Sequence, residues 1–182
     1  YEGEDATMFE LIHRRIWVGN ENVIQSYNKL YLPLTNSDDA QIIKARVLLP
    51  NGTVLHLDAD DVQEGKDEDD NVYQYFALDG VQKGSIVEYL FLTKEQPNYL
   101  GTRYTLQRDA PIYNLKFELI TPFNLQFKLK SYNALNQPQN DTVLKYQNRY
   151  FIHQDTLVKF KEEPQSYERA YLGYVIFALD RN

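Results

Sequence analysis

Apolar and polar residues alternate along most of the chain, which is the pattern of strands with one buried and one solvated face. Two neighbouring segments show it clearly. Their apolar faces carry Tyr113, Leu115, Phe117 and Leu119, then Leu125, Phe127 and Leu129. Pro122 lies between the segments and can interrupt a hydrogen-bond ladder. We therefore expect two consecutive antiparallel strands here.

A third segment, "IIKARVLL" at 42–49, predicts the first strand of a hairpin. Its core face would carry Ile43, Ala45, Val47 and Leu49, with Lys44 and Arg46 on the opposite face. The sequence "PNG" at 50–52 follows, and then "TVLHL". Asn-Gly between alternating hydrophobic residues is a strong hairpin signal because both residues tolerate a positive φ.

The rest of the chain continues in the same manner. Further strands are expected at 9–18, 29–34, 72–78, 85–93, 103–108, 143–152, 156–160 and 171–179. The best helix candidate is "ENVIQSY" at 21–27, about two turns long. The sequence therefore predicts a mainly β fold, an antiparallel β-sandwich with at most one or two short helices, in a single domain spanning 1–182. The strand at 171–179 is apolar on both faces, so we expect it to be an inner strand or to be covered.

Composition and charge exclude several classes of function. The 182 residues include 26 acidic and 19 basic side chains, giving a net charge of −7, and no basic stripe offsets it, so we expect no nucleic-acid partner. There is no cysteine, which excludes disulfides, thiolate metal sites and a cysteine nucleophile in this chain. The longest apolar run, "SIVEYLFL" at 85–92, is too short to span a membrane.

Residues 58–70 are strongly acidic and raise the question of a calcium site. The window from Asp67 places Asp69 and Asn71 at the third and fifth positions of an EF-hand loop. However, Val72 stands where the loop needs glycine and Leu78 where it needs glutamate. We therefore expect a solvated loop joining two strands and no tight calcium binding, and a weak site of another geometry remains open.

Candidate catalytic groups are few. Glu88 and Glu118 could act as paired carboxylates, or each could lie on a wet strand face or in a cross-strand ion pair. His13, His56 and His153 share no metal-binding spacing, although a zinc site assembled in space is conceivable. No nucleophile elbow or phosphate-binding glycine motif occurs. We predict no catalytic, cofactor-binding or metal-binding residue, and no cofactor.

Clustered aromatic residues suggest a binding surface. Tyr73 and Tyr75 in "NVYQYF" at 71–76, and the tyrosines of "SYERAYLGY" at 166–174, could present rings for stacking on sugars or for a protein partner. Half-buried strand residues with a hydroxyl at the rim are the alternative explanation.

Several segments together resemble a bacterial family of domains of unknown function that lie immediately before a transglutaminase-like domain in multidomain, often exported proteins. The matching segments are "IHRRIWVGNENVIQSY", "DAQIIKARVLLPNGTVLHLDADDV", "FALDGVQKGSIVEYLF", "TLQRDAPIYNLKFELITP" and "FKEEPQSYERAYLGYVIFA", which span most of 10–179.

The resemblance implies a mainly antiparallel β-sandwich fused to a downstream, papain-like Cys-His-Asp catalytic domain. It also implies export to the periplasm or cell envelope. The chain begins without an initiator Met and ends where the family pattern would pass into a linker, so we expect it to be part of a longer protein. The expected function is a non-catalytic accessory domain that positions or recruits substrates or partners for that downstream domain. The alternative is a free-standing glycan- or peptide-binding module that uses exposed tyrosines.

Overall fold

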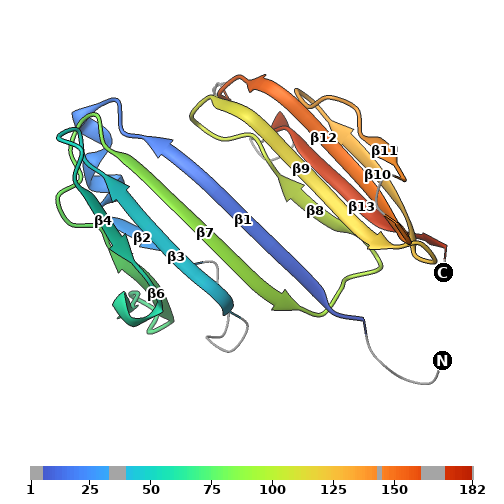
Figure 1. Cartoon of the computed structure of the whole chain (residues 1–182), viewed down its shortest axis with the longest axis horizontal. Helices are drawn as coiled ribbons and strands as arrows, with labels where there is room; N and C mark the ends of the chain where they lie inside the picture. The colour runs from blue at the N-terminus through green and yellow to red at the C-terminus, as the bar shows by residue number, and fades with distance from the viewer. Residues whose placement is uncertain (1–5, 33–39, 143–144, 161–170, 182) are drawn as a thin grey trace. The chain divides into compact units, whose positions relative to one another are not determined.

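The computed structural model describes residues 6–32, 40–142, 145–160 and 171–181 (Figure 1). They form two compact units, with the boundary between Pro97 and Asn98. Every strand pairing among them joins strands of the same unit. Each unit therefore builds its own sheets.

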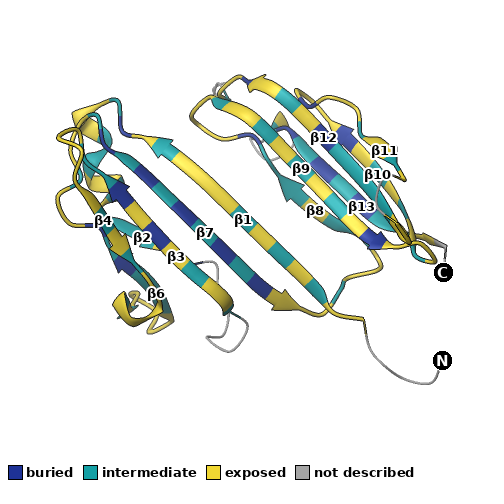
Figure 2. Cartoon of the chain, viewed as in Figure 1, coloured by how far each residue is buried: buried dark blue, intermediate teal, exposed yellow. Residues whose placement is uncertain are grey.

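The larger sheet of the first unit is antiparallel, with the strand order β1-β7-β3-β4. Its strands are β1 (Met8–Trp17), β3 (Ala40–Leu48), β4 (Val54–Leu57) and β7 (Ile86–Glu95). Burial alternates along β7, where Val87, Tyr89 and Phe91 are buried and the residues between them are half-buried (Figure 2). One face of the sheet therefore lines a core, and the other faces outward.

A smaller antiparallel sheet, with the order β2-β6-β5, completes the first unit. It contains β2 (Lys29–Tyr31), β5 (Val62–Lys66) and β6 (Val72–Ala77), and the connections include the 3-10 helices η1 (Glu21–Tyr27) and η3 (Ala59–Asp61). The predicted helix at 21–27 thus exists in 3-10 form. It begins after Asn20, whose Oδ1 accepts a hydrogen bond from the backbone N–H of Asn22 at 2.9 Å, as helix N-caps commonly do.

One hydrophobic core joins the two sheets of the first unit. Val47 from β3, Val87 from β7 and Phe76 from β6 have no exposed surface. Burying each of these side chains stabilises the fold by about 1.5–3 kcal/mol. The core face predicted for 43–49 is confirmed, because Ala45 and Val47 are buried while Lys44 and Arg46 are exposed.

The hairpin predicted around Asn51 and Gly52 is confirmed. Strands β3 and β4 pair from Leu48 with Val54, and the loop is closed by a backbone hydrogen bond from Leu49 to Thr53 at 2.8 Å. Gly52 has φ +87°, which a glycine adopts without steric cost.

The second unit contains two antiparallel three-stranded sheets with the orders β10-β13-β8 and β11-β12-β9. Its strands are β8 (Thr102–Thr105), β9 (Ile112–Pro122), β10 (Gln126–Tyr132), β11 (Gln139–Asp141), β12 (Gln147–Leu157) and β13 (Tyr174–Arg181). The ring of Phe117 on β9 lies 6.3 Å from that of Phe177 on β13. Aromatic contacts of this kind hold the two sheets together, with Ile152 and Val175 almost fully buried.

The mainly antiparallel β-sandwich predicted from sequence is confirmed. The inner-strand version of the C-terminal prediction is also confirmed, because β13 lies between β10 and β8. Whether the two units together form the predicted single domain spanning 1–182 depends on how they associate. The single domain therefore stays a prediction. Parts of the expected strands, at 33–34 and 143–144, lie outside the described residues.

Several local expectations were wrong. The strands expected at 143–152 and 156–160 form one strand, β12, which ends at Leu157. Strands β9 and β10 follow each other in the chain but pair with different partners, β12 and β13. Tyr113, expected on the core face, is 72% exposed, because the next residue, Asn114, has φ +58° and interrupts the alternation.

Candidate functional site

The Glu88 carboxylate lies on the outward face of the larger sheet in the first unit. The register places Glu88 opposite both Arg15 on β1 and Arg46 on β3. Arg46 approaches Oε2 with Nε and Nη2, each at 2.6 Å, and the Nε of Arg15 is 3.6 Å from Oε1. The Nε2 of His13 is 2.9 Å from the same Oε1. These four residues are called the Glu88 cluster.

The pKa of Glu88 reflects two opposing effects. Its side chain is only 12% exposed, and this burial raises the pKa because it disfavours the charged form. Hydrogen bonds from His13 and Arg46, together with the charges of Arg46 and Arg15, outweigh burial and hold the pKa below its ordinary value. At neutral pH, Glu88 is therefore an ionised hydrogen-bond acceptor.

A second ion-pair group, the Arg149 cluster, lies in the second unit and comprises Glu118, Asp141, Arg149 and His153. The Nη2 of Arg149 is 2.7 Å from Oε1 of Glu118, and its Nη1 is 3.1 Å from Oδ2 of Asp141. The Nε2 of His153 is 3.1 Å from Oε1 of Glu118. Strands β9, β11 and β12 each contribute, so the cluster ties one whole sheet together.

Hydrogen bonding dominates the electrostatics of the Arg149 cluster. The hydrogen bond from Arg149 is the main reason that the pKa of Glu118 is lowered, and the bond from His153 adds to it. The bond to Glu118 raises the pKa of Arg149 in turn. Both partners are therefore charged at neutral pH.

The geometry supports ion pairing for Glu88 and Glu118, which is one of the two roles that the sequence left open. A glycosidase-type mechanism needs a carboxylic acid whose pKa is raised, so that it can donate a proton near neutral pH. The pKa of each glutamate is lowered instead. Sequence reasoning did not find Arg15, Arg149 or Asp141, because the contacts depend on strand register.

The three histidines occupy separate places. His13 contacts Glu88, His153 contacts Glu118, and His56 on β4 lies opposite Arg46 in the register. Across the described ranges, no group of three His, Asp or Glu side chains is placed to hold a metal ion.

The acidic run at 58–70 is more ordered than the predicted loop, which was wrong on this point. Asp58 and Asp61 form a reciprocal capping box around η3, and residues 62–66 form the strand β5. Asp67 organises the turn into β6. Its Oδ1 accepts from the backbone N–H groups of Asp69 and Asn71, and its Oδ2 accepts from the Asn71 side-chain amide. Hydrogen bonding to Asn71 is also the main reason that the pKa of Asp67 is lowered. The absence of tight calcium binding stays a prediction.

Three tyrosine rings gather on the smaller sheet of the first unit. The ring centroids of Tyr31, Tyr73 and Tyr75 lie 5.4 to 6.3 Å apart, and Tyr31 is 57% exposed. These three residues are called the tyrosine cluster. The Lys29 ammonium lies 4.4 Å from the centroid of Tyr75, and a Cβ added to Gly65 would come within 2.6 Å of the Tyr73 ring. Tyr73 therefore packs on the backbone of β5. Residues 166–170 of the other tyrosine segment lie outside the described residues.

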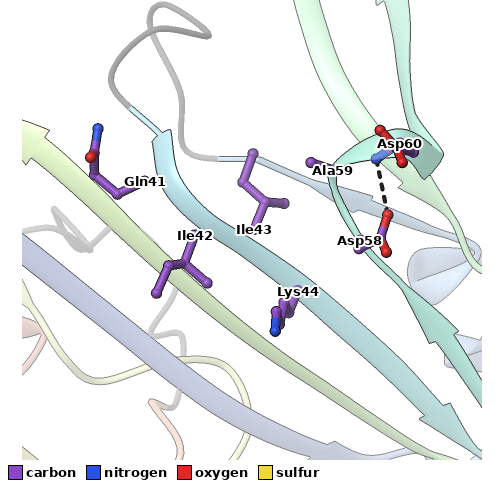
Figure 3. Close-up of a pocket in the computed structure, with 7 residues that line it drawn as sticks. All are labelled: Gln41, Ile42, Ile43, Lys44, Asp58, Ala59 and Asp60. Carbon is purple, nitrogen blue, oxygen red and sulfur yellow. Dashed lines mark hydrogen bonds between the residues drawn. The ribbon is translucent and has the colours of Figure 1, made fainter.

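A shallow pocket of about 290 Å³ lies beside the end of β4 (Figure 3). It is lined by Gln41, Ile42, Ile43, Lys44, Asp58, Ala59 and Asp60. Strand β4 pairs with β3 only from Ala45 onward, so the lining combines the earlier part of β3 with the η3 turn. Asp58 accepts a hydrogen bond from the backbone N–H of Asp60, which assigns this carboxylate to the turn.

Comparison with known proteins identifies the family. The sequence pattern of DUF3857, described as a domain of unknown function with a solved structure, matches residues 5–156. The chain belongs to the DUF3857 family. No curated protein matches it. In the described part of this DUF3857 member, no helix is long and apolar enough to cross a membrane.

One solved structure has a similar fold. It is the 2.00 Å crystal structure of a protein described as a "putative protease" from Parabacteroides distasonis ATCC 8503. The two folds match with a TM-score of 0.76 at 12% sequence identity, over 95% of this chain. The DUF3857 chain spans 37% of the chain that it matches.

Proposed function

We propose that this DUF3857 chain is a non-catalytic accessory domain of a longer bacterial polypeptide. It precedes a transglutaminase-like catalytic domain of the cysteine protease-like class, and it positions or recruits substrates and partners for that domain. The longer protein is exported to the periplasm or cell envelope.

One observation carries the proposal: a fold like this one makes up 37% of a longer chain that is described as a "putative protease". Two features of the chain agree with an accessory role. It has no cysteine, so a thiolate nucleophile must come from another part of the protein. Glu88 and Glu118 are each held by arginine and histidine side chains of neighbouring strands, in two different sheets.

The direct test is to sequence the source gene beyond the codon for Asn182. The expected result is an open reading frame that continues into a domain containing a Cys, followed by His and Asp. A stop codon directly after Asn182 would contradict the proposal.

A second test measures what the accessory domain does. The full-length protein and a version lacking 1–182 are compared on denatured casein and on a short chromogenic peptide. Recruitment predicts that KM for casein rises about tenfold on deletion, which equals about 1.4 kcal/mol of lost binding, while turnover of the short peptide is unchanged. An equal loss on both substrates would instead indicate a damaged catalytic domain.

The tyrosine cluster favours one alternative, a free-standing glycan- or peptide-binding module. Aromatic rings exposed on a sheet face can stack on sugars or bind peptide side chains. A glycan array probed with the chain tests this, with Tyr31→Ala, Tyr73→Ala and Tyr75→Ala as variants. A blank array with folded protein would contradict glycan binding. Because Tyr73 packs on Gly65, the exposed Tyr31 gives the cleanest variant.

A further inference from the structure

The larger sheet of the first unit presents an ordered outer surface. Strands β1, β7, β3 and β4 lie side by side (Figure 1), and every second residue of each faces away from the core. The register sorts these residues into rows across the sheet. The first row, called the Trp17 row, contains Trp17, Ile86, Leu48 and Val54, and the second, the Arg15 row, contains Arg15, Glu88, Arg46 and His56. The third, the His13 row, contains His13, Leu90 and Lys44, and the fourth, the Leu11 row, contains Leu11, Leu92 and Ile42. This surface is called the outer face.

The apolar members of the outer face are unusually exposed. Trp17, the single tryptophan of the chain, is 71% exposed, and Leu11 and Phe9 on the same strand are 61% and 58% exposed. The Trp17 ring lies against Gly19, where an added Cβ would come within 2.8 Å of it. Gly19 thus leaves room for the indole. Exposed aromatic residues bordered by charge are the usual anchors of protein interfaces.

The charge of the outer face is opposite to that of the chain. Its outward positions on the four strands carry four cations, Arg15, Lys44, Arg46 and Lys94, and the imidazoles of His13 and His56, against one acidic residue, Glu88. The chain as a whole has a net charge of −7. The side chains of Arg15 and Arg46 are 55% and 44% exposed, so N–H donors remain accessible beside the bonds to Glu88. Asp58 and Asp60, which follow β4, line a pocket together with Lys44.

We propose that the outer face binds an extended polypeptide segment in which carboxylates stand between apolar side chains. Successive rows are two residues apart along each strand, which is about 6.7 Å. An extended peptide repeats its side chains on one face at the same interval. Consider a peptide with an apolar side chain bound at the Trp17 row. Carboxylates two and four residues later in the peptide would then lie at the Arg15 and His13 rows. A second apolar side chain, six residues after the first, would lie at the Leu11 row. The proposal rests on the recruiting role proposed above and names the ligand chemistry.

Polypeptide fits the outer face better than a phosphate polymer does. The charged rows lie between the apolar Trp17 and Leu11 rows, and a continuous phosphate backbone laid across the rows would also have to cover these two apolar rows. A peptide that carries both apolar side chains and carboxylates matches the apolar rows and the charged rows, whereas a uniformly negative polymer matches only the charged rows.

Trp17 provides the test, because it reports binding by its own fluorescence. The probe is the capped peptide Phe-Ser-Glu-Ser-Glu-Ser-Leu, which contains no tryptophan, titrated into the whole chain. The expected result is a saturable blue shift of Trp17 emission. The peptide with Lys in place of Glu, and the peptide with Ser in place of Phe and Leu, should bind at least tenfold more weakly.

Variants locate the site. In anisotropy titrations with dye-labelled peptide, the double variant Arg15→Gln with Arg46→Gln, and separately Trp17→Ala, should each weaken binding about tenfold or more. The matched control, Lys128→Gln with Lys130→Gln in the second unit, removes the same charge and should change binding less than twofold. Thermal unfolding verifies that each variant folds, and Trp17→Ala alters an exposed side chain, so it remains informative if the arginine variant is destabilised.

Three results would overturn the proposal. The first is no shift of Trp17 emission up to about 1 mM peptide, which is the weak-binding limit of the measurement. The second is equal binding of the lysine peptide. The third is a shift that follows protein concentration alone, together with a dimer in sedimentation. The last would assign the outer face to a second copy. Because these measurements use the chain by itself, they are independent of whether a catalytic domain follows Asn182.

Discussion

Each unit has a charge cluster that links the strands of one of its sheets, and the two clusters have opposite charge arrangements. In the Glu88 cluster, one carboxylate contacts two guanidinium groups and an imidazole. In the Arg149 cluster, one guanidinium contacts two carboxylates, from Glu118 and Asp141. The central group is thus an anion in the first unit and a cation in the second.

Because the central charges are opposite, similar cross-strand ion pairs leave the two sheet surfaces with different net charges. Around Glu88 the positive charges outnumber the negative one, so the outer face retains the capacity to attract an anion. Around Arg149 the two carboxylates outnumber the guanidinium, and its side chain is only 24% exposed. Removing either central residue would leave like charges facing each other across a sheet.

The largest expected effect comes from the cores beneath the clusters. Phe76→Ala in the first unit and Phe177→Ala in the second should each lower the free energy of unfolding by about 3–5 kcal/mol, because both rings are buried. Amide hydrogen exchange resolves the effect by strand. Phe76→Ala should expose β3, β6 and β7. If β9 and β12 lose protection with them, residues 1–182 behave as one cooperative domain. A loss below about 1 kcal/mol would contradict the core assignment.

Replacing the central residues compares the clusters directly. Glu88→Gln should cost about 1–3 kcal/mol, and Arg149→Gln should also be destabilising, because in each case the remaining side chains lose a charged hydrogen-bond partner. Adding Arg46→Gln to Glu88→Gln should recover part of the loss, and adding Asp141→Asn to Arg149→Gln should do the same. Urea unfolding of the single and double variants measures this. Strictly additive effects would show that the residues do not act as clusters.

Acid should weaken both clusters. The folded-state pKa values of Glu88 and Glu118 lie below the ordinary value of 4.5 that applies to the unfolded chain. Their stabilisation is therefore fully present above that value and is lost as pH falls through the folded-state pKa. Unfolding free energies measured between about pH 6 and pH 3 should fall with acid. The fall should be shallower in Glu88→Gln and in Glu118→Gln, and an unchanged slope would contradict the assigned ion pairs.

The smallest change in the free energy of unfolding is expected from a variant in an exposed ion pair outside both clusters. Lys66 and Asp70 lie 3.4 Å apart with side chains 64% and 87% exposed. Lys66→Ala should change the free energy of unfolding by less than about 0.5 kcal/mol, because water and salt screen an exposed pair. A loss as large as that of Glu88→Gln would show that exposure does not distinguish the clusters from ordinary surface pairs.

Local sequence signals predicted most of the fold. Alternation located β3, the apolar run at 85–92 located β7, and the Asn-Gly pair located the hairpin after Leu49. Strand β5 was missed because "VQEGK" has little apolar pattern and depends on Tyr73 packing over Gly65 from the neighbouring strand. Tyr113 was wrongly predicted to face the core, because the alternation of apolar and polar residues gives no sign of the positive φ at Asn114.

The clusters could be predicted only in part. Alternation placed Arg46 on the solvated face and left a cross-strand ion pair open for Glu88. The partners themselves required the register, because Arg46 and Glu88 are 42 residues apart in the chain, and Arg149 and Glu118 are 31 apart. The exposure of Trp17 likewise depends on the order of strands in the sheet.

The position of β13 sets the order in which the chain can fold during synthesis. β8 and β10 both pair with β13, and it contains the last described residues. Every described strand of the first unit has been synthesised once Glu95 is added, so that unit can fold while the rest of the second is still being translated. A nascent chain that ends before Tyr174 would carry a closed first unit and an open second one, with the apolar faces of β8 and β10 presented to chaperones.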